Sequence, residues 1–138
     1  MPSKKWIVEI PGFVTPSANE YLRLHYRNRH KKRMGWDVLL RHYGHLAKVK
    51  KATGKRKVTV WRYGMRLLDE ANLMTPIDKM LIDPMRNNIV KRMGRMSFNL
   101  AGLGWIVDDC PRYLDLEVKQ RKVPKHRIKM VIEIEDLS

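Results

Sequence analysis

The chain has 138 residues, 43% of them hydrophobic, and its 29 Lys and Arg against 14 Asp and Glu give a formal charge of +15 at pH 7. This length suits a single domain with one hydrophobic core, and the apolar content excludes a disordered basic tail. The charge indicates a polyanionic partner, nucleic acid or an acidic membrane surface. The lone Cys110 excludes an internal disulfide and a Cys-based zinc site. No apolar stretch approaches the length of a membrane span, and no signal-peptide core follows residues 1–5. We therefore expect a cytoplasmic protein that does not enter a membrane.

The first half of the chain predicts two strands and one helix. Residues 6–10 read as a short strand. Residues 13–34 are polar and basic and are predicted to form a loop. Apolar residues then recur at three- and four-residue steps, which predicts an amphipathic helix over 35–51. Residues 58–65 are β-branched and aromatic on both faces, as in a central strand.

The second half predicts one helix and further strands. Thr75 is a candidate cap for a helix that starts at Pro76, and Pro84 should end or kink that helix near Asp83. Residues 105–107 form a predicted short strand. Two alternating segments, 114–118 and 128–134, are predicted to pair as a hairpin.

Together these elements predict a mixed α/β (α+β) fold: one small domain over 1–138, with a mixed sheet flanked by two or three helices. Residues 86–102 form a basic insert in this pattern. We interpret the insert as a helical extension packed on the body, with a basic arm that grips a partner as the alternative.

Two acidic clusters interrupt the basic sequence, Asp69-Glu70 after the strand at 58–65 and Asp108-Asp109 after the strand at 105–107. If those strands run parallel with the helix as a right-handed crossover, both clusters reach the same edge of the sheet. Convergent carboxylates suit Mg²⁺, with Mn²⁺ as the alternative ion. Such a metal beside phosphate supports hydrolysis of a phosphodiester. Read singly, each acidic pair is more often a helix cap or a solvated loop charge.

Four segments in order resemble the motifs of the RusA-like Holliday junction resolvases. Pro16–Arg23 is similar to the Pro-x-Ser-x-Asn motif of that family, and Asp69–Leu73 is similar to its Asp-x-Asp-Asn-Leu core. Lys79–Asp83 resembles the Lys-x-x-x-Asp that follows, and Gly104–Asp109 resembles Gly-x-x-x-Asp-Asp. The resemblance extends along nearly the whole chain.

The resemblance implies a homodimer that cuts four-way DNA junctions symmetrically with Mg²⁺, in a bacterial or phage-infected cell and without a small-molecule cofactor. It implies that Asp69 and Asp109 are metal-binding catalytic carboxylates, with Asp108 as their neighbour. Lys79 would act at the scissile phosphate. Glu70 is a further candidate ligand, because Ala71 stands where the family motif has its second acid.

The candidate DNA contacts come from the motifs, the basic run before the predicted helix, and the insert. They supply affinity through phosphates, so binding should fall with salt. They are Asn19, Arg23, Arg27, Arg29, Lys31, Lys32, Arg33, Asn72, Arg92 and Arg95.

Two other functions remain open. Ala71 is compatible with a catalytically impaired protein of the same fold that binds junctions or other nucleic acid without cutting. A ribosome-associated RNA binder fits the charge but leaves Asp69, Asp108 and Asp109 unexplained.

Overall fold

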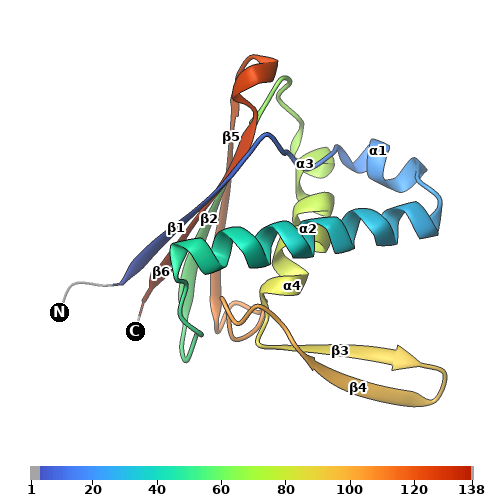
Figure 1. Ribbon diagram of the computed structural model, residues 1–138, viewed down its shortest axis with the longest axis vertical. Coiled ribbons are helices and arrows are strands. Elements are labelled where there is room, and N and C mark those ends of the chain that lie inside the picture. Colours follow the sequence, from blue (N-terminus) through green and yellow to red (C-terminus); the bar gives the residue numbers. More distant parts are fainter. Residues whose placement is uncertain (1–3, 138) are drawn as a thin grey trace.

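A computed structural model describes the backbone of residues 4–137, and all their side chains except those of 90–93, 98 and 99. The fold is mixed α+β, as the sequence predicts. A twisted sheet forms one side of the molecule, the helices lie together against it, and a two-stranded arm projects from the far end (Figure 1).

The main sheet has the strand order β1-β6-β2-β5. These strands are β1 (Lys5–Pro11), β6 (Lys129–Asp136), β2 (Arg56–Gly64) and β5 (Leu114–Lys122). Strand β6 is antiparallel to both β1 and β2, whereas β2 and β5 are parallel. The sheet is therefore mixed, and β2 is an interior strand, as the apolar character of 58–65 predicts.

The predicted hairpin between 114–118 and 128–134 is wrong, although both strands exist. Strand β2 lies between β5 and β6 and pairs with each of them. An alternating pattern defines which face of a strand is buried, but it does not specify the neighbouring strand.

The core lies between the sheet and the helices. Val58 and Val60 of β2 and Ile132 and Ile134 of β6 are completely buried. Burial of each such side chain contributes about 1.5–3 kcal/mol to folding. This packing fixes the helices, and with them the functional side chains, against one face of the sheet.

The prediction of a loop over 13–34 is wrong, because α1 (Ala18–Arg23) and α2 (Tyr26–Ala47) occupy much of it. The first half of α2 is almost wholly solvent-exposed, so no apolar period reveals it. The helix predicted over 35–51 is the second half of α2, and it ends earlier, where Lys48 takes a left-handed conformation at φ 58°. No helix within residues 4–137 combines the length and apolar character needed to cross a membrane.

A second helical segment runs through α3 (Glu70–Ile77), the π-helical turn η1 (Asp78–Ile82) and α4 (Asp83–Met85). The predicted start at Thr75-Pro76 is wrong, because Asp69 caps the helix and Pro76 lies inside it. The segment ends at Met85, just after Pro84, as the proline predicts. The wider π-helical turn precedes this proline, which lacks an N–H for the helical ladder.

Residues 86–102 form a β-arm, so their interpretation as a helical extension is wrong. Strands β3 (Asn88–Met93) and β4 (Met96–Ala101) pair antiparallel around a two-residue turn in which Gly94 has φ 62°. Positive φ at a glycine is typical of tight hairpin turns. The predicted strand at 105–107 is reduced to one isolated bridge between Ile106 and Arg86.

Candidate active site

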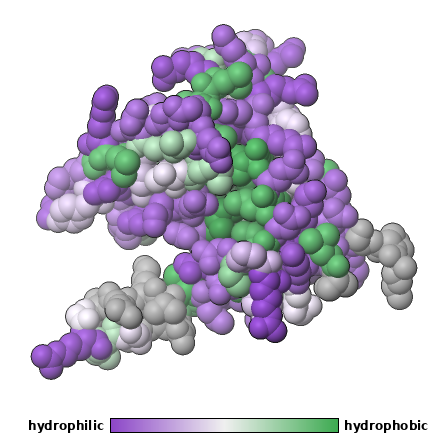
Figure 2. Space-filling model, turned by 180° about the vertical axis from the view of Figure 1, so that it is seen from behind, coloured by the Kyte–Doolittle hydropathy of each residue, from purple (hydrophilic) through white to green (hydrophobic). Residues whose placement is uncertain are grey.

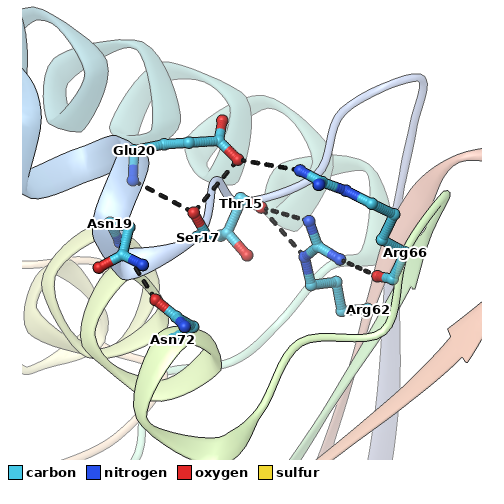
Figure 3. A network of polar contacts seen from close by, with 7 residues as sticks. All are labelled: Thr15, Ser17, Asn19, Glu20, Arg62, Arg66 and Asn72. Atoms are coloured by element: carbon cyan, nitrogen blue, oxygen red, sulfur yellow. Dashed lines mark hydrogen bonds and ion pairs between the residues drawn. The ribbon is translucent and has the colours of Figure 1, made fainter.

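The loop that carries the first motif is held by a buried arginine of the sheet (Figure 3). Arg62 of β2 donates Nε–H and Nη2–H to the carbonyl oxygen of Thr15, at 3.0 and 2.9 Å, and Nη1–H to the carbonyl of Arg66 at 3.1 Å. Burial lowers the pKa of Arg62 from its ordinary value. The hydrogen bonds donated by this one buried guanidinium fix both the loop before α1 and the loop after β2.

The first motif itself forms the start of α1. The Ser17 hydroxyl accepts a hydrogen bond from the Glu20 backbone N–H at 3.1 Å and donates to Glu20 Oε1 at 3.2 Å. The same carboxylate oxygen lies 3.7 Å from Arg66 Nη2. A serine cap followed three residues later by a glutamate is a recurring way to begin a helix.

The first and second motifs meet at the start of α3. The Asn19 backbone N–H donates to Asn72 Oδ1 at 3.2 Å (Figure 3). Asn72 in turn donates its backbone N–H and its side-chain amide to the two carboxylate oxygens of Asp69, at 2.9 and 3.2 Å. Asp69 thus caps α3, and both its oxygens are engaged by one asparagine.

The remaining two motifs meet in a cleft at the other end of the same helical segment. Asp78, Lys79 and Asp83 reach this cleft from η1 and α4, and Asp109 reaches it from the loop before β5. The cleft has a volume of about 410 Å³. We call it the acidic cleft, and its other lining residues are Ile82, Pro111, Leu114 and Leu116.

Burial and neighbouring negative charges raise the pKa of Asp78 in the acidic cleft. Partial burial is the main cause of the raised pKa of Asp78, the charges of Asp83 and Asp109 add to it, and Lys79 opposes it. Repulsion between carboxylates is relieved by protonation or by a bound cation.

The neighbouring Asp83 shows the same effect. Burial again comes first in raising its pKa, and Asp109 raises it further, whereas Arg86, Lys79 and Arg33 lower it. Three carboxylates therefore interact electrostatically across one cleft, with basic side chains at its border.

The acids come together by a route other than the predicted crossover. The parallel partner of β2 is β5, which follows Asp109, so Asp108 and Asp109 precede a strand of the sheet instead of ending one. Asp69 begins the helical segment, and Asp78 lies nine residues along it, roughly 14 Å of helical rise. The structure therefore brings Asp109 to Asp78, Lys79 and Asp83 and leaves Asp69 at the opposite end of the segment.

The other predicted metal ligands have separate surroundings. Glu70 is exposed in the first turn of α3. One carboxylate oxygen of Asp108 accepts a hydrogen bond from the Asp109 backbone N–H at 2.8 Å. Asp78 and Asp83 were not predicted as site residues. For Asp83 the available signal was its spacing of four residues from Lys79, which puts the two side chains on one face of a helix.

The predicted DNA contacts fall on three surfaces. Asn19 and Asn72 join the two helix starts described above, and Arg23 lies in the last turn of α1. The exposed N-terminal half of α2 carries the basic run, of which Arg29 is half-buried. Arg95 is exposed at the tip of the β-arm, while the side chain of Arg92 lies outside the described side chains. The basic run consists of Arg27, Arg29, Lys31, Lys32 and Arg33.

The acidic cleft contains the oxygen donors that Mg²⁺ prefers. Among residues 4–137, no three Asp, Glu, His or Cys side chains are arranged as a group that could hold a metal ion by themselves. Mg²⁺ usually keeps several waters and binds one or two carboxylates together with substrate phosphate. The donor set therefore fits an ion that is completed by substrate and water, and it does not fit a closed structural metal site.

Comparisons with protein-family models, with curated proteins and with solved structures found no significant match to this chain.

Proposed function

We propose that this protein is a metal-dependent endonuclease that cuts branched DNA, with the four-way junction as its substrate. The observation that carries the proposal is the acidic cleft, where Lys79 lies among three interacting carboxylates in a chain of charge +15. A binder of nucleic acid gains nothing from clustered carboxylates next to the phosphates it attracts. A hydrolase uses them to hold a divalent cation.

Residues of the cleft have distinct roles in this proposal. Asp83 and Asp109 would hold Mg²⁺, with Mn²⁺ as the alternative ion, and Asp78 would add negative charge. The bound metal would supply Lewis-acid activation of water and of the leaving oxygen. Lys79 would contact the scissile phosphate and stabilise the charge that develops there. Asp69 and Asn72 would act as positioning residues that fix the helix carrying Lys79.

The motif resemblance supports the choice of substrate and a homodimer. A four-way junction presents paired equivalent strands, and two subunits related by a twofold axis can place one cleft on each. The basic N-terminal half of α2 and the exposed Arg95 would supply phosphate contacts. Each of these contacts adds affinity without reading sequence.

A catalytically impaired junction-binding protein is the second candidate function. Ala71 replaces an acid of the motif, and no described group of side chains is a metal site by itself. In this case the acidic cleft would be a remnant, and the basic surface would still bind DNA.

One assay separates the two candidates. A synthetic four-way junction is incubated with the full chain in Mg²⁺ and, separately, in EDTA. We expect paired nicks that require Mg²⁺ and that fall at least about 100-fold in Asp109→Asn, as is typical when a charge-stabilising group is removed. Asp115→Asn, on the exposed part of β5, is the matched control and should cut like the wild type.

A shift of the junction without nicks in Mg²⁺ or Mn²⁺ would refute the nuclease and support the binding protein. Equal affinity for linear duplex and junction would refute the choice of a branched substrate.

A further inference from the structure

A second depression adjoins the acidic cleft and separates α2 from the β-arm. One wall is formed by Arg33, Met34 and Arg41 of α2, and the other by Ile89 and Leu100 of the arm. Its volume is about 430 Å³, and we call it the arm groove. From behind, the tip of the arm stands clear of the rest of the surface at the lower left (Figure 2).

The arm groove and the acidic cleft share part of their floor. Lys79 and Asp83 line both depressions. An extended ligand that lies in the arm groove would therefore reach the carboxylates of the acidic cleft. Arg33 is close enough for its charge to lower the pKa of Asp83. Arg33 therefore lies where the arm groove meets the acidic cleft.

The root of the arm is well fixed, so the groove has a defined wall. The backbone N–H of Gly102 donates to the carbonyl of Asn87 at 3.0 Å, and that of Leu103 donates to the carbonyl of Pro84 at 2.8 Å. Ile106 adds a bridge to Arg86. The first bond closes the arm at its root, and the second joins the root to the end of the helical segment.

Positive charge dominates the lining of the groove. Arg33, Arg41, Lys79 and Arg86 all line it. Of the two acids there, Asp37 is already engaged by Arg41, whose Nε lies 2.8 Å from the carboxylate. Guanidinium groups bind phosphate through paired hydrogen bonds, so the lining is complementary to a phosphodiester backbone.

The walls also carry exposed apolar side chains. Met34 is 56% exposed and Leu100 is 45% exposed, on opposite sides of the groove. The outer surface of a duplex offers mainly phosphates, whereas an unpaired strand also offers the apolar faces of its bases and sugars. Alternating guanidinium and apolar groups therefore suit a single strand.

We infer that the arm groove holds an unpaired DNA strand and leads it past Arg33 into the acidic cleft. The substrate class is then a branch with a splayed or flapped strand, including a junction opened at its centre. This inference rests on the proposed nuclease for its last step, the entry of the strand into a cutting site.

Binding in EDTA tests the groove without requiring cleavage. The anisotropy of a labelled single strand of ~15 nucleotides, within the usual site size of such surfaces, is compared with that of a duplex of equal length. Arg33→Glu should weaken single-strand binding about tenfold or more. Lys125→Glu is the control with the same change of charge, because Lys125 is exposed between β5 and β6 and does not line the groove; it should change binding less than about threefold.

A second pair of variants tests the apolar walls. Met34→Ser should weaken single-strand binding about threefold or more and leave duplex binding unchanged. Val38→Ser, one turn along the same helix and 66% exposed, should leave both unchanged. Melting curves of all four variants should match that of the wild type.

The outcomes separate the inference from the proposed function. Equal losses in Arg33→Glu and Lys125→Glu would overturn the inference, because net charge alone would then explain binding. An effect of Met34→Ser on duplex alone, or none on either probe, would also overturn it. Single-strand binding that depends on Arg33 in a chain that never cuts DNA would support the groove and refute the nuclease.

Discussion

Asp78 and Asp83 are held where their negative charges are disfavoured. Each is partly buried and faces the charge of Asp109, and Asp78 also faces the charge of Asp83. A folded chain gains no stability from this arrangement, and functional sites commonly retain such groups at the expense of stability. The raised pKa values are therefore consistent with selection for a ligand, for which a cation is the natural candidate.

Replacing Asp83 should stabilise the metal-free protein at neutral pH. The folded-state pKa of Asp83 lies above its ordinary value of 3.8, so the folded state binds the proton more tightly than the unfolded state. Stability from this group is present below pH 3.8 and is lost as the pH rises through the raised value. Asp83→Asn removes that loss, and its melting temperature in EDTA should exceed that of the wild type by a few degrees at pH 7.

The same comparison at lower pH provides the control. The difference in melting temperature should shrink as the pH approaches 3.8, because Asp83 is then neutral in both states. Asp115→Asn should show no such pH-dependent gain. A lower melting temperature for Asp83→Asn at pH 7 would show that the charged carboxylate stabilises the fold.

At the scale of elements, the helical segment from Glu70 to Met85 connects the motifs. Its first turn meets the Pro16–Asn19 motif through Asn72, and its last turns meet Asp109. Local patterns predicted β1, β2 and the second half of α2, because their apolar residues face the core at regular spacing. They did not predict the first half of α2, whose surface is solvated, or the neighbours of β5 and β6.

The candidate site was predictable only in part, because local sequence patterns do not specify which elements become neighbours. Lys79 and Asp109 belong to motifs and lie in one cleft. The partners of Asp109 could not be derived, because they depend on which strand pairs with β2. The sequence pattern joined Asp109 to Asp69, whereas the fold places it beside Asp78 and Asp83.

The β-arm depends on one close backbone approach. A side chain on Gly102 would collide with the backbone carbonyl of Arg86 and lie tightly against that of Pro84. Gly102→Ala should therefore lower the free energy of unfolding by about 1–3 kcal/mol in urea denaturation, through strain at the root of the arm. It should also weaken single-strand binding if the arm forms one wall of the groove.

Gly35→Ala is the contrasting variant. Gly35 lies in α2 with nothing near the position of an added Cβ. Alanine should stabilise this helix by about 0.5–1 kcal/mol, because it has the higher helix propensity. Equal effects of the two substitutions would contradict the close approach at Gly102.

For the whole molecule, the charge of +15 and the position of the acidic cleft work together. The hydrophilic surface seen from behind surrounds an apolar patch at its middle (Figure 2). A strongly basic surface attracts DNA from a distance, but its contacts are screened by salt. The carboxylates of the acidic cleft form a local negative site, which would repel a DNA phosphate unless a cation were bound between them. The predicted homodimer would place two such sites on one junction. Sedimentation of the protein in low and high salt would measure whether its mass is that of a dimer.

The proposed metal site in the acidic cleft can be measured directly in solution. Mn²⁺ is titrated into the full chain without DNA, and the unbound ion is followed by electron paramagnetic resonance. We expect saturable binding that weakens at least about tenfold in Asp109→Asn and in Asp83→Asn. Asp69→Asn should bind within about threefold of the wild type, since asparagine is also a good helix cap. Loss of binding in Asp69→Asn with full binding in Asp109→Asn, or no binding by the wild type, would contradict a metal site in the acidic cleft.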